Sequence, residues 1–431
     1  MLISFKVKIF RSFHQEQTFS MQAYERHGLG LNTHAWATQR ADIPYVLKNA
    51  VIFGANASGK SNFLKAIQFM KGFVLQSVTV ANPGVEANLV PFLLNEDSRK
   101  EPTLFEIELL IEGVRYQYGF SLLQKKVLEE YLIAYPKKNP QTWFSRQWND
   151  EAQKYEYKYS THFKGNKKTW EETTRESVLY LSTAVALNSV QLRPIYDWFG
   201  SQLVVINDVE TLNQRFTIEQ IKSGKHKDNV VELLKSADLS ISSIELQKRK
   251  TPAKNVVFDT RSETVKINEE GIEEDIVLFG HQTDEGTVYL PINFESAGTQ
   301  KFFQLAGPLI DILSKKVTIL IDELDTSLHP MLVEKIVELF VTVSDKTEGA
   351  QLIFTTHCES LLENNTSDTG ISPLLRRDQV WFVSKDHTHA STLYSLLKFK
   401  VRNNESVREG YRRGRFDGIP MIENLRFSVK E

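Results

Sequence analysis

Alternating polar and apolar positions predict two groups of antiparallel strands in the first third of the chain. The stretches Ser4–Phe10 and Gln17–Met21 both alternate, which favours an antiparallel pair. Residues 103–135 alternate almost without a break, and "EG" and "QKK" provide the turn signals. This second region therefore predicts three further antiparallel strands.

A different pattern, in which an apolar run ends in polar residues, recurs along the chain. The stretch "YVLKNAVIFGANASGKSNFLKAIQFMKGFV" reads as a buried strand, a glycine turn and a helix. Later, "KKVTILIDELD", "QLIFTTH" and "QVWFVSKD" each place polar residues after an apolar strand. Apolar strands that alternate with helices predict a parallel sheet covered on both faces, with functional groups at the carboxyl ends of its strands.

Residues 136–285 are less regular, and we interpret them as an inserted domain. They combine short strand-like runs, a helical run at Asn229–Ala237 and several basic patches. The acidic stretch "EEGIEED" (Glu269–Asp275) is typical of an exposed turn. After it, "VYLPINF" predicts a strand that leads into a helix.

Composition narrows the classes of protein. With 431 residues, 41% of them hydrophobic and 25% charged, the chain matches a globular protein of two or three domains. No window approaches the roughly 18 apolar residues of a membrane-spanning helix. The N-terminus carries no signal-peptide pattern, so we expect a cytoplasmic protein without a membrane partner. The single cysteine, Cys358, excludes an internal disulfide framework.

The formal net charge of −2 argues against a uniformly basic nucleic-acid coat but leaves local patches open. Each patch reads more readily as a solvated face than as a binding surface. The patches are Lys222–Lys227, Lys167–Trp170, Lys248–Lys250 and the cluster Arg402, Arg408, Arg412, Arg413 and Arg415.

The stretch "GANASGKS" has the spacing of a phosphate-binding loop and lies between the predicted strand and helix, as that function requires. Its glycines allow backbone N–H groups to surround a phosphate, Lys60 can reach the terminal phosphate, and the Ser61 hydroxyl can bind Mg²⁺. The predicted nucleotide-binding residues are Gly54, Ala55, Asn56, Ala57, Ser58, Gly59, Lys60 and Ser61.

A phosphate-binding loop requires an acid at the end of another strand, and "VTILIDE" supplies it. Asp322 is predicted to bind nucleotide and to act with Ser61 in holding Mg²⁺, and Glu323 to polarise the attacking water. His357, at the end of "LIFTTH", can contact the terminal phosphate or hold that water. A metal-nuclease reading of "DELD" lacks the further carboxylates of a two-metal site.

The stretch "ESAGTQKFF" predicts a helix N-terminus, which is a general anion site. Ser296 can cap the helix and Gly298 leaves room for a close approach. Since the phosphate-binding loop already surrounds one phosphate, a second anion site is best explained if it faces the ATP of another subunit. A plain helix cap is the alternative.

In order, "GANASGKS", "SAGTQ", "ILIDELDTSLHP" and "FTTH" resemble the ABC-type ATPase heads of the RecF, SMC and Rad50 group. The resemblance extends to small bacterial relatives, the AAA15 or OLD-like ATPases, which include RloA-type abortive-infection proteins. It implies a Walker A loop at Gly54–Ser61, Asp322 as the Walker B acid and Glu323 and His357 as catalytic residues. Further roles implied are a signature at Ser296, Gly298 and Thr299 that acts in trans, and a D-loop acid at Asp325.

The resemblance also implies a fold: an α/β P-loop NTPase with an ABC-type ATPase head, a mixed sheet and an antiparallel β subdomain, split by an inserted α+β or helical domain. The expected parts are the N-terminal half of the head (1–135), the insertion (136–285), the C-terminal half (286–385) and a basic tail packed on the head (386–431).

By the same resemblance, the chain is expected to be an ATPase that uses ATP and Mg²⁺ and forms a homodimer or larger homo-oligomer. Nucleotide-dependent dimerisation would control a separately encoded effector, such as a Toprim-like or RloB-like nuclease, in anti-phage defence. The alternative is a RecF-like repair or recombination ATPase that binds nucleic acid. A transporter ATPase is disfavoured because "SAGTQ" replaces the LSGGQ signature.

Overall fold

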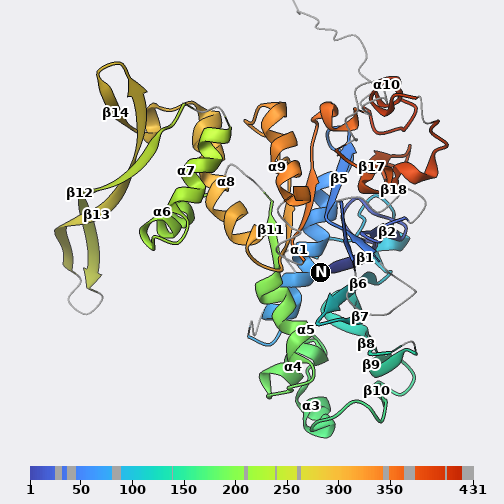
Figure 1. Cartoon of the computed structure of the whole chain (residues 1–431). Helices are drawn as coiled ribbons and strands as arrows, with labels where there is room; N and C mark the ends of the chain where they lie inside the picture. Colours follow the sequence, from blue (N-terminus) through green and yellow to red (C-terminus); the bar gives the residue numbers. More distant parts are fainter. Residues whose placement is uncertain are drawn as a thin grey trace, which may run out of the picture. The chain divides into compact units, whose positions relative to one another are not determined.

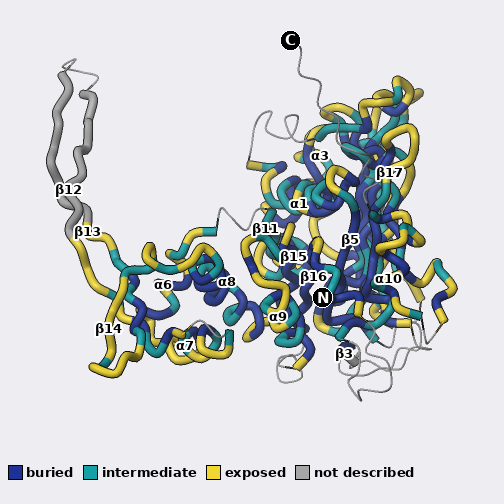
Figure 2. The backbone as a smooth tube through the Cα atoms, turned by 90° about the horizontal axis from the view of Figure 1, so that it is seen from above, coloured by how far each residue is buried: buried dark blue, intermediate teal, exposed yellow. Residues whose placement is uncertain are grey.

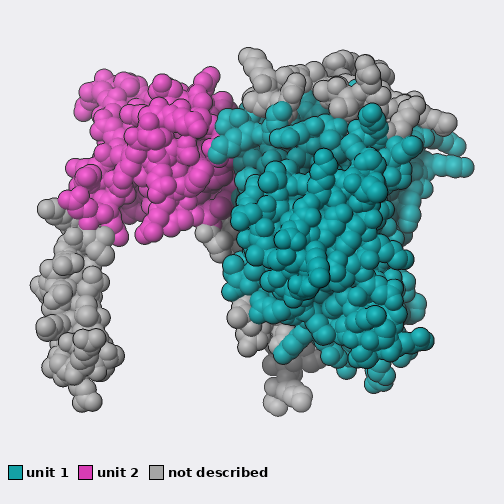
Figure 3. All heavy atoms as spheres, turned by 90° about the horizontal axis from the view of Figure 1, so that it is seen from below, with its two compact units in different colours: residues 1–209, 312–325, 333–431 teal, residues 210–311, 326–332 magenta. Residues whose placement is uncertain are grey.

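The computed structural model describes residues 1–24, 32–35, 45–79, 89–137, 139–207, 212–237, 240–259, 264–342, 349–363, 374–402 and 405–419, with the backbone alone between 250 and 272. It divides into two compact units (Figure 3). Unit 1 comprises residues 1–209, 312–325 and 333–431, and unit 2 comprises residues 210–311 and 326–332. Among the residues described, no helix is long and apolar enough to cross a membrane.

Unit 1 contains a seven-stranded antiparallel sheet in the order β10-β9-β8-β7-β6-β1-β2 (Figure 1). The predicted N-terminal pair is confirmed, since β1 and β2 are antiparallel. The three strands predicted between residues 103 and 135 are also confirmed as β6, β7 and β8. The bounds are β1 Leu2–Lys8, β2 Gln17–Ser20, β6 Thr103–Ile111, β7 Val114–Leu123, β8 Lys126–Tyr135, β9 Gln141–Asn149 and β10 Lys154–Tyr159.

The second sheet of unit 1 has the order β11-β15-β16-β5-β17-β18. Its first five strands are parallel, and β18 is antiparallel to β17. The predicted parallel sheet is therefore confirmed, and the polar residues that follow β5, β15, β16 and β17 meet at one edge. The bounds are β5 Asn49–Gly54, β11 Leu203–Ile206, β15 Thr318–Ile321, β16 Gln351–Thr355, β17 Val380–Lys385 and β18 Ser391–Ser395.

Helix α1 (Lys60–Gln76) packs in a core that it shares with both sheets. The Phe63 ring meets Phe5 of β1 edge to face at 5.8 Å, and Phe69 stacks on Phe105 of β6 at 5.1 Å. Ile52 of β5 belongs to the same buried cluster. Figure 2 shows β5 buried along its length, as expected for a strand covered on both faces. This packing fixes the loop between β5 and α1.

Residues 139–207 belong to unit 1, although the sequence predicted a single insertion over 136–285. Strands β9 and β10 extend the antiparallel sheet, and the buried Glu130 carboxylate accepts the backbone N–H groups of Tyr180 and Leu181 at 2.6 and 2.9 Å. The observed boundary between units thus falls inside the predicted insertion, and the four-part division stays a prediction. Helices of this region are α3 Lys167–Thr173, α4 Tyr180–Ala186 and α5 Arg193–Asp197.

Unit 2 contains a three-stranded antiparallel sheet, β12-β13-β14, and helices. The prediction of a turn at Glu269–Asp275 was wrong, because these residues lie inside the long strand β13. Register places Asp275 and Glu274 opposite Lys248 and Arg249 of β12, so cross-strand charge pairing compensates for the acidic run. The bounds are β12 Ser243–Asp259, β13 Thr264–Thr283, β14 Gly286–Pro291, α6 Arg215–Lys222 and α7 Lys227–Ser236, the last confirming the predicted helical run.

Two short strands and three helices are also described. Helices α8 and α9 each contain one of the boundaries between the two units, and α10 lies in the C-terminal part of unit 1. The bounds are β3 Thr33–Ala35, β4 Tyr45–Leu47, α8 Ala297–Leu313, α9 Pro330–Thr342 and α10 Val407–Arg412.

Candidate functional site

The predicted phosphate-binding loop connects β5 to α1, and its two glycines are required by their surroundings. A Cβ atom on Gly54 would lie 2.5 Å from the Val383 carbonyl oxygen of the neighbouring strand. Gly59 has a φ of +116°, and a Cβ there would lie 2.3 Å from the Ser391 hydroxyl. A side chain at either position would therefore displace the loop from β17 or β18.

Polar contacts with two segments that are distant in the sequence support the loop. The Ser391 hydroxyl donates to the Ser58 carbonyl at 2.5 Å, and the Ser391 backbone N–H donates to Ser12 O at 2.7 Å. Asn62 donates from Nδ2 to the Ser12 hydroxyl at 2.9 Å. These contacts hold the loop in one shape before any ligand binds.

Lys60 is buried and its ammonium group donates to carbonyls of its own loop. Nζ lies 2.8 Å from Gly54 O and 3.1 Å from Ala55 O. Burial lowers the pKa of Lys60, while the nearby carboxylates of Glu323, Asp322 and Asp325 oppose that shift. The three predicted acids therefore lie close enough to Lys60 to influence its charge.

The two acids after β15 are held by β16. The buried Thr355 hydroxyl donates to Asp322 Oδ1 at 2.6 Å, and the Glu323 backbone N–H donates to Thr355 Oγ1 at 2.7 Å. Asp322 is buried, whereas Glu323 is exposed and lines the cavity in front of the loop. The sequence did not single out Thr355, although it lies in the quoted "FTTH".

His357 lies between Lys60 and Asp325. Its Nε2 is 3.1 Å from Lys60 Nζ, and its backbone N–H donates to Asp325 Oδ2 at 3.1 Å. Since an ammonium group can only donate, this contact requires an unprotonated Nε2 and places the imidazole proton on Nδ1. Partial burial and the Lys60 charge lower the pKa of His357, which favours this neutral form.

A cavity of about 540 Å³ opens in front of the loop. It is lined by residues 56–62 together with Glu323, His357 and Lys385. Lys385 is exposed at the end of β17, and the sequence analysis missed it, although "QVWFVSKD" showed the same apolar-to-polar pattern as the other strands. The structure thus brings Lys60, Glu323 and His357 to one cavity, with Asp322 and Asp325 beside them.

The residues that would hold Mg²⁺ have suitable chemistry. Ser61 lines the cavity, and Asp322 contributes a carboxylate of which one oxygen is already hydrogen-bonded to Thr355. Mg²⁺ prefers oxygen ligands and is commonly held by one or two protein groups plus phosphates and water. Within the described residues no group of three or more His, Cys, Asp or Glu side chains could form a separate metal site. A small Ser61 and Asp322 set therefore fits a metal that arrives with a nucleotide.

The predicted signature residues lie in unit 2, at the start of α8. Ser296 caps the helix as predicted, since its Oγ accepts the Thr299 backbone N–H at 3.1 Å and lies 2.9 Å from the Thr299 hydroxyl. A Cβ on Gly298 would lie 3.1 Å from Ser327 O, so the glycine permits a close backbone approach. Ser296 itself is exposed.

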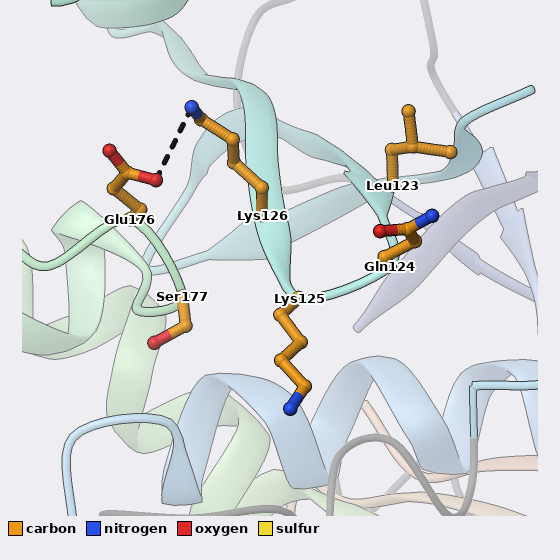
Figure 4. A pocket seen from close by; sticks show the side chains of 6 residues that line it. All are labelled: Leu123, Gln124, Lys125, Lys126, Glu176 and Ser177. Carbon is orange, nitrogen blue, oxygen red and sulfur yellow. Dashed lines mark ion pairs between the residues drawn. The ribbon is translucent and has the colours of Figure 1, made fainter.

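A second cavity of about 470 Å³ lies at the turn between β7 and β8 (Figure 4). Residues 123–126, Glu176 and Ser177 line it. Lys126 Nζ pairs with Glu176 Oε2 at 3.2 Å and lies 2.8 Å from the centre of the Trp148 ring. The cation is thus engaged by the protein itself, and we assign no ligand to this cavity.

Each of the basic patches noted in the sequence has at least one cation that is paired with an acid. In the C-terminal cluster, Arg412 Nε lies 2.6 Å from Glu359, and Arg413 lies 3.8 Å from Glu409. The remaining pairs are Arg408 with Glu363, Arg415 with Glu405, Lys222 with Asp275, Lys168 with Glu172 and Lys248 with Glu273. This pairing supports the interpretation of these patches as solvated faces.

A parallel sheet with a glycine loop between strand and helix, and with an acid after a neighbouring strand, defines a P-loop protein of mixed α/β fold. A family profile described as "AAA domain, putative AbiEii toxin, Type IV TA system" matches residues 50–363. Because the match covers well over half of the chain, the chain belongs to this family. Membership supports an AAA-type ATPase in general, and the narrower AAA15, OLD-like or RloA-type assignment stays a prediction.

Comparison with solved structures returns heads of SMC proteins. The SMC head domain from Thermotoga maritima has 14% identity and a TM-score of 0.38, covering 93% of this chain and 99% of its own. An Smc head with an extended coiled coil, bound to the C-terminal domain of ScpA and derived from Pyrococcus furiosus, has 13% identity, coverage of 96% and 98%, and a TM-score of 0.36. These scores are too low to support conclusions about function. No curated protein matches the chain.

Proposed function

We propose that this chain is a Mg²⁺-dependent ATPase whose nucleotide-dependent dimerisation controls a separate effector in anti-phage defence. The observation that carries the ATPase part is the convergence of Lys60, Glu323 and His357 on the cavity in front of the glycine loop. The N–H groups of the loop and Lys60 would bind the phosphates of ATP. Mg²⁺ held by Ser61 and Asp322 would offset the phosphate charge when the nucleotide is bound.

Each of the side chains that line the cavity has a separate role in the proposed reaction. Lys60 exchanges the carbonyls of Gly54 and Ala55 for phosphate oxygens, which bind an ammonium group more strongly. Glu323, exposed to the cavity, accepts a proton from the attacking water as a general base. The neutral His357 ring orients that water or contacts the terminal phosphate, and its backbone is fixed by Asp325.

A second copy of the chain completes the site in this proposal. Ser296, Gly298 and Thr299 form a capped helix N-terminus that suits an anion, and Ser296 is exposed. Since the loop of the same chain already provides for the phosphates, we place this terminus on the ATP of the partner. Asp325 would then lie near the contact between the two subunits.

The defence role rests on the family and on the chemistry of the chain. The family description names a putative AbiEii toxin and a toxin–antitoxin system. Within the described residues, no group of three or more His, Cys, Asp or Glu side chains could hold the metal ions of a nuclease centre. We propose that the effector, such as a Toprim-like or RloB-like nuclease, is a separate protein. Co-purification of the tagged chain with the products of neighbouring genes tests this, and recovery of nucleic acid alone would contradict it.

The RecF-like alternative, a DNA-binding repair ATPase, is less well supported. Each basic patch that could contact phosphate groups has at least one cation paired with an acidic side chain of the same chain. A DNA-clamping protein would show affinity for duplex that falls steeply with salt, because phosphate contacts release counterions. We expect weak duplex binding by the purified chain, with or without ATP.

Glu323→Gln tests the assignment of the general base. The substitution removes the proton acceptor but keeps the size of the side chain, so hydrolysis should fall about 10²- to 10⁴-fold while ATP binding persists. Steady-state hydrolysis and the lifetime of bound ATP measure the two effects. Glu172→Gln on α3, which removes an exposed acid paired with Lys168, is the control. Rapid turnover by Glu323→Gln would remove Glu323 from the mechanism.

A further inference from the structure

The end of β16 makes an unusual double contact with the residues that follow β15. Thr355 is fully buried and is the last residue of β16. Its hydroxyl oxygen forms hydrogen bonds with two consecutive residues, Asp322 and Glu323. It lies 2.6 Å from Asp322 Oδ1 and 2.7 Å from the Glu323 backbone nitrogen. The Thr355 carbonyl also accepts the Leu324 N–H at 3.1 Å. One residue thus contacts three consecutive positions of the acidic turn.

The direction of these hydrogen bonds is fixed by chemistry. A backbone N–H can only donate, so the Thr355 oxygen accepts from Glu323. The hydroxyl has a single proton, and Asp322 Oδ1 is the carboxylate oxygen placed to receive it. A hydrogen bond to one oxygen of a carboxylate restricts the rotation of that side chain. The second oxygen of Asp322 is thereby left to face other ligands.

The hydrogen bond between Thr355 and Glu323 also constrains the backbone conformation of Glu323. Glu323 has a φ of +50°, a left-handed conformation that a non-glycine residue adopts only where the surroundings enforce it. The hydrogen bond from its N–H to Thr355 Oγ1 is one such constraint. Without it the turn can relax, and the carboxylate of Glu323 would leave its place on the cavity.

We infer that Thr355 is a positioning residue that couples the two acids, setting the metal-binding oxygen of Asp322 and the direction of Glu323 together. This inference rests on the proposed ATPase function. Thr355 itself touches neither nucleotide nor water, since it is fully buried behind the turn. Its hydroxyl acts through Asp322 on the affinity for Mg²⁺ and through Glu323 on the chemical step.

Thr355→Val removes the hydroxyl and keeps the shape of the side chain. The same chain provides a matched control. Thr318, at the other end of β15, is equally buried and donates its hydroxyl to Gln351 Oε1 at 2.8 Å. Thr318→Val therefore removes one buried hydrogen bond, whereas Thr355→Val removes two, and it leaves the acidic turn unchanged. Thr355→Ser keeps the hydroxyl, and Thr355→Ala serves if the valine variant does not fold.

The experiment titrates a fluorescent ADP analogue into the full chain with Mg²⁺ and with EDTA, and measures ATP hydrolysis in parallel. Thr355→Val should bind in EDTA like wild type, but Mg²⁺ should improve its affinity about 10- to 100-fold less, because supporting residues of metal ligands typically have effects of this size. kcat should fall by a similar factor. Thr355→Ser and Thr318→Val should stay near wild type in both measurements.

Two failures can be told apart. If Thr355→Val, or Thr355→Ala in its place, keeps both the Mg²⁺ effect and the wild-type kcat, Thr355 does not position the acids, and the ATPase assignment stands. If the wild-type chain binds no nucleotide in either condition, the proposed function fails and the inference fails with it. If Thr318→Val loses the Mg²⁺ effect as strongly as Thr355→Val, the loss reflects general destabilisation and the inference is overturned.

Discussion

Lys60 illustrates how the site is prepared at the scale of single residues. Its ammonium group is held by the Gly54 and Ala55 carbonyls and lies against His357. These are neutral partners, so binding of a phosphate would replace weak acceptors by charged ones. The pKa values of Lys60 and His357 are both lowered because burial disfavours the positively charged form of each side chain.

The lowered pKa of His357 predicts a dependence of stability on pH. Its folded-state pKa lies below the ordinary value of 6.5, so below pH 6.5 the unfolded chain takes up a proton more readily than the folded chain. Stability contributed by the neutral ring is therefore present above pH 6.5 and is lost as the pH falls through the folded-state pKa. Wild type should lose more stability over this window than His357→Gln. Urea midpoints at a series of pH values measure it, and parallel curves would contradict the assignment.

Lys385 predicts a contribution to nucleotide affinity that the sequence did not reveal. It is an exposed cation that lines the cavity, and we expect it to approach the phosphates of a bound nucleotide. Lys385→Met should weaken ATP binding about 10-fold, the value of one charge-assisted hydrogen bond. Lys164→Met, which removes an exposed lysine outside the cavity, is the control. Equal affinities for ATP in the two variants would exclude Lys385 from the phosphate site.

At the scale of elements, the loop between β5 and α1 depends on its glycines. Gly59→Ala places a Cβ against the Ser391 and Ser12 hydroxyls in a backbone conformation with φ of +116°. We expect a cost of about 1 to 3 kcal/mol in stability and a large loss of nucleotide affinity. Gly72→Ala, inside α1 with open space around its Cβ, should instead be neutral or stabilising. Thermal unfolding and nucleotide titration of both variants check this, and a Gly59→Ala chain that behaves like Gly72→Ala would contradict it.

The strands best predicted from the sequence are those in which the pattern of apolar and polar residues follows directly from which faces of the strand are buried. β6, β7 and β8 alternate because one face of each is more buried than the other, and β5, β15 and β16 are apolar throughout because both faces are covered. The turn predicted at Glu269–Asp275 failed because an acidic run can lie in a strand when its neighbour supplies lysine and arginine. This charge compensation depends on the pairing of β13 with another strand, so the residues of the acidic run alone do not reveal it.

The candidate site was predicted where a motif spans several residues and missed where a single side chain acts. Gly54–Ser61, Asp322 and Glu323 follow from spacing and from the ends of strands. Thr355 and Lys385 depend on which strands are neighbours, since β16 lies beside β15 and β17 beside β5. A threonine or lysine at a strand end is common, so only the topology indicates their importance.

At the scale of the whole molecule, the predicted site residues are divided between two compact units. Unit 1 contains the loop, the acids and His357, and unit 2 contains Ser296, Gly298 and Thr299. We propose that the two sets form one site when the α8 terminus of one chain faces the nucleotide of another. The site would then be incomplete in a single chain, and hydrolysis would report the assembly of two copies.

Complementation between two inactive variants tests this central claim most directly. Lys60→Ala removes the cation of the loop, and Ser296→Arg blocks the α8 terminus while every residue of the loop is kept. Each variant alone should have little activity, although Ser296→Arg should still bind ATP. When they are mixed, half of the dimers formed at random contain both variants and one intact site. We predict hydrolysis at roughly a quarter of the wild-type rate in the mixture. Wild-type turnover by Ser296→Arg alone, or a mixture no more active than its components, would contradict a site shared between two chains.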